Sequence, residues 1–232
     1  MGHRSTEWLL CEFAQVDYRR ALCLQRDIAA AKHRGSIEED FLLMLEHPPV
    51  FTLGRRGGRE NLTVSEAFLS ERGIPVVQIE RGGNITYHGP GQLVLYPIVS
   101  LARRKLSVTG FVEGLESVMI RIAADFGVTA ARDARNRGVW VKNAKLGSIG
   151  INIRHGVAFH GLALNVNTDL APFSWVRPCG LSGVSMTSLA AEAGAAPVAM
   201  EKARQAARSH FEAVFGVRLE AIEPAALEEL LG

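Results

Sequence analysis

Two long segments of the chain carry apolar residues at helical spacing and end in glycine. Residues 14–34 stop at Gly35, and residues 108–126 stop at Gly127. Apolar positions three and four residues apart, with a glycine just beyond the last one, predict amphipathic helices. By the same reasoning, further helices are predicted at about 186–193, at 200–215 and after Pro224.

Shorter apolar runs, bounded by glycine, proline or polar residues, predict strands between these helices. Thr63 and Glu66 are predicted to form the capping box of a short helix that ends near Gly73. The irregular order of helices and strands favours an α+β fold, with mixed sheets flanked by helices, over a regular βαβ repeat. The predicted strands are 41–47, 50–53, 74–80, 92–98, 138–141, 145–153 and 157–166.

Composition narrows the class of protein. With 232 residues, 47% of them hydrophobic, and no linker or repeat, the chain is expected to form one domain over residues 1–232. A net charge of +2 argues against nucleic-acid binding. The sequence has no signal core and no run of about 18 apolar residues, so we expect a cytoplasmic protein without a membrane segment. Three cysteines suit a reducing compartment, and Cys11 and Cys23 are expected on apolar faces.

The sequence RGGNITYHGPGQLVLYPI, residues 81–98, places several glycines directly before a predicted strand. Glycine weakens strands and costs backbone entropy, so this density indicates that the main chain turns sharply or lies close to something else. The glycine spacing does not match a dinucleotide-binding fingerprint, and no helix is predicted after it. We expect a loop or hairpin between strands that lies against a ligand.

Cys179, in the sequence RPCGLSG, is the candidate nucleophile. A preceding proline and a following glycine shape the turn, and nucleophiles are often presented on such turns, although an idle loop cysteine is the alternative. An ordinary thiol titrates at about 8.5, so a nucleophilic cysteine needs a neighbour that favours the thiolate. His88, His160 and Lys145 stand in segments of unusual composition. For His160 alone, the ordinary interpretation is a hydrogen-bonded core histidine.

Metal and nucleotide sites are disfavoured. The cysteines lie far apart, and the C-x-x-C, H-E-x-x-H and Walker A patterns do not occur, so we expect neither a metal nor a cofactor. Arginines and lysines cluster at 55–59, 103–105 and 132–137. Each cluster alone is typical of a solvated loop, but together they suit an acidic protein partner.

Three motifs, in order, closely resemble one family. RGGNITYHGPGQLVLYPI, KLGSIGI followed by FHGLALNV, and RPCGLSG followed by MTSL resemble the lipoyl(octanoyl) transferases of lipoate biosynthesis. LEHPPVFTLGR and GVWV also fit, so the resemblance runs from about Leu42 to Leu189. It implies an α+β fold similar to the catalytic domains of biotin and lipoate protein ligases.

The resemblance implies a catalytic domain, 1–232, that transfers octanoyl from acyl carrier protein to a lysine of a lipoyl domain. The acceptors would be lipoyl domains of 2-oxoacid dehydrogenases and the glycine cleavage H protein, and we expect a monomer. Cys179 would hold the acyl thioester, Lys145 would be its acid/base partner, and His160 is a possible supporting residue. The glycines of residues 81–91 would let the main chain form one wall of a narrow acyl slot. The implied substrate-binding residues are Arg81, Gly82, Gly83, Asn84, Ile85, Thr86, Tyr87, His88, Ser148, Ile149, Gly150, Gly161, Leu162 and Ala163.

Three other functions remain open from the residues. An ATP-dependent lipoate or biotin ligase would need no nucleophilic cysteine. An amidotransferase would move octanoyl between lipoyl domains. A non-catalytic protein would bind acyl carrier protein without turnover.

Overall fold

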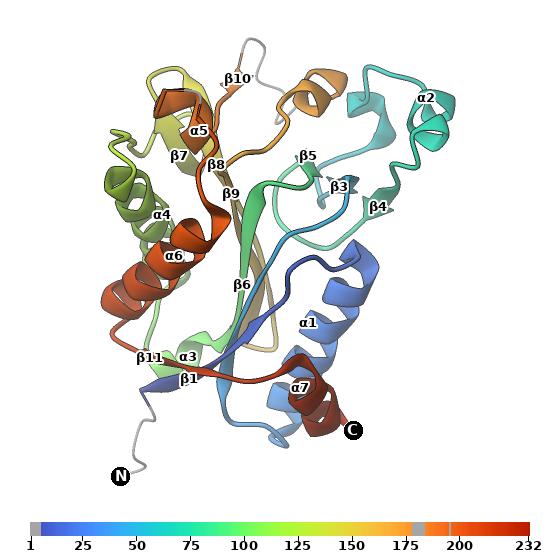
Figure 1. Cartoon of the computed structure of the whole chain (residues 1–232). Coiled ribbons are helices and arrows are strands. Elements are labelled where there is room, and N and C mark those ends of the chain that lie inside the picture. Colours follow the sequence, from blue (N-terminus) through green and yellow to red (C-terminus); the bar gives the residue numbers. More distant parts are fainter. Residues whose placement is uncertain (1–5, 178–183, 195) are drawn as a thin grey trace.

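The computed structural model describes residues 6–177, 184–194 and 196–232, and Figure 1 shows the arrangement of its elements. The strands are β1 (Glu7–Glu12), β2 (Asp40–Leu45), β3 (Val50–Leu53), β4 (Val76–Gln78), β5 (Ile85–His88), β6 (Gln92–Ser100), β7 (Gly138–Val141), β8 (Ala144–Arg154), β9 (Val157–Asn165), β10 (Ser185–Met186) and β11 (Arg218–Ala221). The helices are α1 (Tyr18–Arg34), α2 (Glu66–Glu71), α3 (Leu101–Arg104), α4 (Val108–Asp125), α5 (Leu189–Glu192), α6 (Met200–Phe215) and α7 (Pro224–Leu231), with 3₁₀ turns η1 (Arg59–Asn61) and η2 (Ala171–Trp175).

The long helices and most strands confirm the prediction from apolar spacing, and the differences have local causes. α1 begins at Tyr18 because the Asp17 carboxylate accepts hydrogen bonds from two backbone N–H groups of its first turn. The predicted capping box was wrong: Ser65 caps α2 by accepting from the N–H of Phe68. Residues 186–193 are not one helix, since β10 ends at Met186 and α5 begins only at Leu189.

Two sheets form the framework. In the larger sheet the strands follow the order β10-β8-β9-β6-β2-β1-β11, and β7 pairs with β8 outside this path. The antiparallel pairs β2–β6, β6–β9 and β8–β9 form its centre, and parallel pairs lie at both ends. The smaller sheet has the order β4-β3-β5. This mixture of parallel and antiparallel strands confirms the predicted α+β class.

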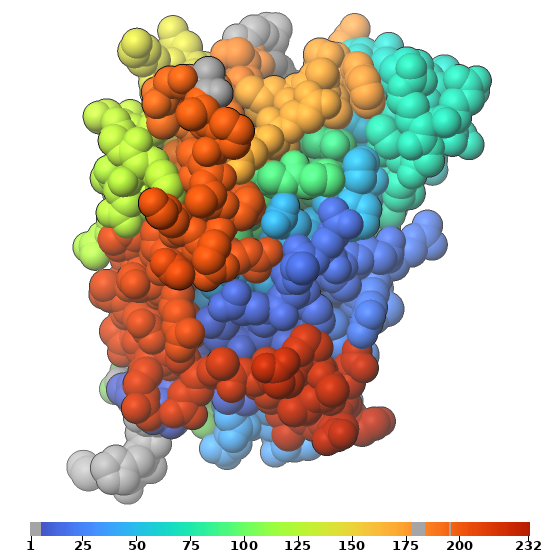
Figure 2. Space-filling model, viewed as in Figure 1, coloured from blue at the N-terminus to red at the C-terminus, as the bar shows by residue number. Residues whose placement is uncertain are grey.

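Helices cover both faces of the larger sheet (Figure 1). α4 and α6 pack on one face, around a core cluster that includes Phe111, Leu162 and Phe211. α1 packs on the other face, over a second cluster that includes Phe41 and Phe159. Figure 2 shows the C-terminal region, in orange and red, running down one edge and across the base of this view beside the blue N-terminal segment.

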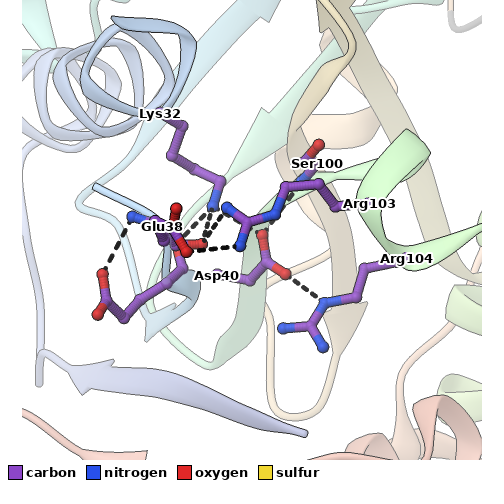
Figure 3. A network of polar contacts seen from close by, with 7 residues as sticks. Lys32, Glu38, Asp40, Ser100, Arg103 and Arg104 are labelled. Carbon is purple, nitrogen blue, oxygen red and sulfur yellow. Dashed lines mark hydrogen bonds and ion pairs between the residues drawn. The ribbon is translucent and has the colours of Figure 1, made fainter. Parts of the chain in front are cut away.

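A buried charge network ties α1 to β2 and α3 (Figure 3). The Asp40 carboxylate, almost fully buried, pairs with the Lys32 ammonium at 2.8 Å and accepts from the backbone N–H of Ser100 at 3.1 Å. The Arg104 guanidinium also pairs with Asp40. Burial lowers the pKa of Lys32, while the charge of Asp40 acts in the opposite direction. The cluster at 103–105 therefore includes an internal ion pair, rather than serving only as a solvated surface.

The cysteine prediction was right for one residue and wrong for the other. Cys11 is buried in β1, but Cys23 lies on the exposed side of α1. None of the helices in the described part of the chain combines the length and the apolar composition that crossing a membrane requires.

Candidate active site

A cavity of about 810 Å³ opens where the larger sheet meets the smaller one. Its walls come from the glycine-rich loop before β5, from β5 itself, from the adjacent strands β8 and β9, and from residues 133–137. Val184 and Met186 line it as well. The predicted residues that line it are Arg81, Gly83, Asn84, Ile85, Thr86, His88, Lys145, Ser148, Ile149, Gly150, His160, Gly161, Leu162 and Ala163.

The remaining predicted residues lie elsewhere or outside the described residues. The Tyr87 ring packs against Phe51 and Phe173 in the core beneath the smaller sheet. The Gly82 N–H donates to the carbonyl of Ile151 on β8 at 2.9 Å, which fastens the loop to the strand. Cys179 lies outside the described residues.

A β-bulge aims Lys145 into the cavity. Val139 and Trp140 are consecutive on β7, but their partners on β8 are Gly147 and Lys145, so Leu146 is an extra residue. Leu146 packs in the core on the α4 side, whereas Lys145 lines the cavity with Ser148 and Gly150. A bulge of this kind redirects side chains that strict alternation would place on opposite faces.

The buried Lys145 side chain runs beside Gly138 and over Trp140. Its Nζ lies 5.4 Å from the centroid of the Trp140 ring, within reach of a cation–π interaction. A Cβ atom at Gly138 would lie 2.9 Å from Cε of Lys145 and 2.3 Å from the carbonyl oxygen of Gly147. Gly138 also has φ +121°, so this position requires glycine for two separate reasons.

A buried carboxylate on α4 holds the loop that precedes β7. Glu116 accepts from the N–H of Gly138 at 3.0 Å and from Nε of Arg132 at 2.9 Å, and Arg137 lies 3.6 Å away. This loop contributes Arg135 and Arg137 to the cavity lining. Glu116 therefore positions one side of the cavity from the opposite face of the sheet.

The glycine-rich loop lies directly on β8. A Cβ atom at Gly150 would lie 2.8 Å from Cδ of Arg81 and 3.1 Å from the carbonyl oxygen of Gly82. Arg81 is itself buried, and its Nη2 donates to the carbonyl and the hydroxyl oxygen of Thr52 at 2.8 and 2.9 Å. Close approach of the loop thus explains the glycine at position 150 on β8.

A chain of hydrogen bonds runs from the end of β5 toward Lys145. Nδ1–H of His88 donates to Gln92 at 2.7 Å, because the Gln92 amide nitrogen is directed at the Asn165 carbonyl oxygen, 2.9 Å away. The Asn165 amide donates to the carbonyl of Thr187 at 3.0 Å. The Thr187 N–H donates to the carbonyl of Lys145 at 3.0 Å. Burial is the main cause that holds the pKa of His88 well below its ordinary value.

A second chain of hydrogen bonds lies behind the cavity. Nδ1–H of His47 donates to the carbonyl of Val16, and its Nε2 accepts from the Tyr96 hydroxyl, both at 2.8 Å. Burial lowers the pKa of His47 to about 4, partly opposed by the bond to Val16. The imidazole is therefore neutral near neutral pH and can accept that proton. Tyr18 and Tyr96 both line the cavity.

His160 differs from His88 and from His47. It is 1% exposed, and neither ring nitrogen has a hydrogen-bond partner among the described residues. Burial lowers its pKa to about 3; Glu80 raises it, and Arg81 and Arg26 lower it further. The ordinary interpretation of a hydrogen-bonded core histidine is thus wrong for its ring, although its backbone N–H donates to Gln25 at 2.8 Å.

Two of the three arginine clusters reach the cavity. Arg56 from the first, and Arg135 and Arg137 from the third, line it together with Asp133. Arg135 pairs with Asp133 at 2.8 Å. The cavity therefore carries more positive than negative side chains.

Some of the residues that were missed carry a usable signal in the sequence. Glu116 stands on the buried stripe of α4, four residues after Val112 and three before Met119, where a carboxylate is unusual. Trp140 lies in a predicted strand directly before the candidate lysine. Gln92 begins one predicted strand and Asn165 stands one residue before the end of another, and nothing in their local sequence indicates that they meet.

Known proteins are similar to this chain over most of its length. A family model described as the lipoyl protein ligase A/B catalytic domain matches residues 17–212. An octanoyltransferase from Desulfotalea psychrophila is 56% identical over 187 residues, which is 80% of this chain and 84% of that protein.

Solved structures share the fold. A crystal structure of lipoate-protein ligase A bound with ATP has a TM-score of 0.78 and 17% identity, covering 97% of this chain and 92% of that one. A biotin protein ligase from Aquifex aeolicus has a TM-score of 0.52 and 10% identity, covering 89% and 68%. These likenesses confirm the expected similarity to the catalytic domains of lipoate and biotin ligases at the level of fold.

Proposed function

This chain belongs to the octanoyltransferases of the lipoyl protein ligase A/B family, and we propose that it transfers octanoyl from acyl carrier protein, through a thioester on Cys179, to a lysine of a lipoyl domain. One observation carries the proposal. Lys145 lies in the wall of the cavity. A few residues after Cys179 the chain returns to the same cavity, because Val184 lines it and Met186 pairs with Lys145. We further propose that residues 1–232 act as one catalytic domain, since β1 and β11 are neighbours in one sheet.

The first half-reaction exchanges one thioester for another. The Cys179 thiolate attacks the octanoyl carbonyl carbon, a carbon–sulfur bond forms, and the bond to the carrier's sulfur breaks. The departing thiolate takes a proton from the Lys145 ammonium. Exchange between thioesters is nearly isoenergetic, so this step needs no ATP.

The second half-reaction forms the amide. The acceptor lysine amine attacks the Cys179 thioester, the amide bond forms, and the cysteine leaves as a thiolate. Neutral Lys145 accepts the proton that the amine loses, which restores the ammonium beside the thiolate. One residue therefore serves as acid and then as base, and the two groups titrate as a pair.

The glycine-rich loop, β8 and β9 form the slot for the acyl chain. Leu162 and Ala163 line the cavity with Ile149 and Ile85, while Gly150 and Gly161 leave room between the strands. Each buried methylene contributes about 0.8 kcal/mol, so short acyl chains are expected to bind less well.

The protein partners are expected to be acidic. Arg56, Arg135 and Arg137 lie where the carrier and the lipoyl domain must bring their reacting groups. Clients would be lipoyl domains of 2-oxoacid dehydrogenases and the glycine cleavage H protein. Because exposed charges are screened by salt, the KM for the carrier should rise with ionic strength.

Intact-protein mass spectrometry tests the proposal. The enzyme is mixed with octanoyl-acyl carrier protein without ATP, beside Cys179→Ala and the matched control Cys23→Ala, which removes an exposed cysteine. A hydroxylamine-labile octanoyl adduct is expected on the wild type and on Cys23→Ala but not on Cys179→Ala.

Other outcomes identify the other functions. Octanoylation of a lipoyl domain by Cys179→Ala, dependent on octanoate and ATP, would show a ligase. Transfer only from an octanoylated lipoyl domain would show an amidotransferase. Tight binding of the carrier without any turnover would show a non-catalytic protein.

A further inference from the structure

The register of β8 gives the length of the acyl slot, on the assumption that the proposed function is right. The Lys145 side chain runs beside Gly138, which pairs with Ser148, so its ammonium lies near the level of Ser148. Three residues further along β8, Ile151 pairs with His160 on β9. At about 3.3 Å per residue, the two levels are about 10 Å apart.

An extended octanoyl chain has nearly the same length. Seven carbon–carbon bonds of about 1.5 Å, in a zigzag of about 111°, advance about 1.25 Å each and span about 9 Å. A carbonyl held beside Lys145 therefore places the terminal methyl group at the level of His160.

The backbone at His160 turns its ring toward this point. His160 has φ +59°, a left-handed conformation that is rare for a residue other than glycine, and here it stands inside a long strand. Ala158 and Leu162, two residues before and after His160 on β9, lie in the core on the α4 side, where regular strand alternation would also place His160. The His160 ring instead stacks on Phe159 at 4.9 Å and meets Tyr96 at 6.3 Å, which belong to the cluster on the α1 side. A strained backbone of this kind is often found at functional sites.

No hydrogen bond within the described residues accounts for the burial of the His160 ring. Its two nitrogens lack partners among the described residues, while the rings of His47 and His88 are hydrogen-bonded on both sides. His160 is nevertheless among the residues that line the cavity. Hydrocarbon that extends past this residue would meet the buried ring itself.

We propose that the imidazole of His160 forms the end wall of the acyl slot and sets the longest chain that the enzyme transfers efficiently. The residue is a specificity determinant that contacts the far end of the substrate and takes no part in bond exchange. Chains longer than octanoyl are disfavoured because their extra methylenes have no room beyond the ring.

A competition assay tests this wall. Octanoyl- and decanoyl-acyl carrier protein are supplied in equal amounts with one lipoyl domain, and intact mass gives the ratio of the two products. The ratio does not depend on how much enzyme is active, so a partly folded variant still gives an answer. His160→Gly tolerates the left-handed backbone and removes the ring, and His160→Asn keeps a residue that also tolerates it.

The matched control is His155→Gly. His155 is also a left-handed histidine, at φ +50°, but it lies exposed in the turn between β8 and β9. A buried methylene changes affinity about fourfold, so the decanoyl-to-octanoyl ratio should rise roughly tenfold in His160→Gly, and less in His160→Asn. The control should keep the wild-type ratio.

The outcomes separate this proposal from the proposed function. An unchanged ratio in both His160 variants, with an active wild type, overturns the wall and leaves the octanoyltransferase intact. A wild type that transfers neither chain overturns the proposed function, and the wall with it. An equal rise in the control would assign the effect to a general loosening of the β8–β9 hairpin and would also overturn the wall.

Discussion

Acid should destabilise this protein through buried histidines that the fold keeps neutral. An imidazole titrates at about 6.5 in the unfolded chain. Burial lowers the folded pKa to about 4 for His47 and about 3 for His160. A depressed histidine pKa means that the unfolded chain binds protons that the folded chain refuses. Stability is therefore unaffected well above pH 6.5 and falls as the pH decreases below it.

The expected loss can be calculated from these values. At pH 5 the unfolded chain carries nearly one proton on each of the two imidazoles, and the folded chain carries almost none. The gap of about 1.5 pH units at 1.36 kcal/mol per unit gives roughly 2 kcal/mol for each histidine, or about 4 kcal/mol for both. Against a typical total stability of about 5–15 kcal/mol, this is a large fraction.

Urea unfolding at pH 7 and pH 5, at constant ionic strength, measures the loss. His47→Gln removes the titration and keeps both a donor for the Val16 carbonyl and an acceptor for the Tyr96 hydroxyl. The difference in unfolding free energy between the two pH values should shrink by about 2 kcal/mol in this variant. The reasoning is refuted when His47→Gln loses as much stability between pH 7 and pH 5 as the wild type.

Three further substitutions test the framework of the site. Lys32→Met leaves the buried Asp40 with one charged partner fewer and should lower the free energy of unfolding by about 3 kcal/mol, measured by urea unfolding at pH 7; no change would show that the ion pair contributes nothing. Glu116→Gln removes the charge that holds the loop before β7, so the KM for octanoyl-acyl carrier protein should rise several-fold with a smaller change in kcat; equal losses in both would contradict a positioning role. Gly150→Ala places a methyl group 2.8 Å from Cδ of Arg81, so kcat/KM should fall at least tenfold; wild-type kinetics would show that the loop moves aside at little cost.

The sequence predicted the framework well because most of it follows from local periodicity. α1, α4 and α6 are amphipathic over their full lengths, and α6 has the predicted bounds of 200–215. β1 and β11 were missed because each is short and is fixed by pairing with a distant segment. β5 was hidden in the glycine-rich segment, where four residues form a strand only because β3 lies beside them.

Some residues of the site could be predicted from sequence motifs, whereas other features are revealed only by the fold. Cavity residues such as Lys145 and Gly150 stand in motifs, and their place in the lining follows the resemblance. Neither periodicity nor spacing predicts the bulge at Leu146, which decides where Lys145 points. Nor does local sequence show the Gln92–Asn165 contact, since it joins residues 73 positions apart.

The polar groups around the cavity have a consistent physical role. The proposed acyl slot would lose affinity for hydrocarbon wherever it exposed a charged imidazole, and three histidines lie in its wall or behind it. Burial keeps all three imidazoles neutral near neutral pH. In two of them, His47 and His88, both ring nitrogens are hydrogen-bonded to other residues of the protein. His47 and His88 therefore present little unpaired polarity to the cavity. The third, His160, has no hydrogen-bond partner on either ring nitrogen among the described residues. Under the proposal above it would select by chain length as a neutral ring that a left-handed backbone holds in place.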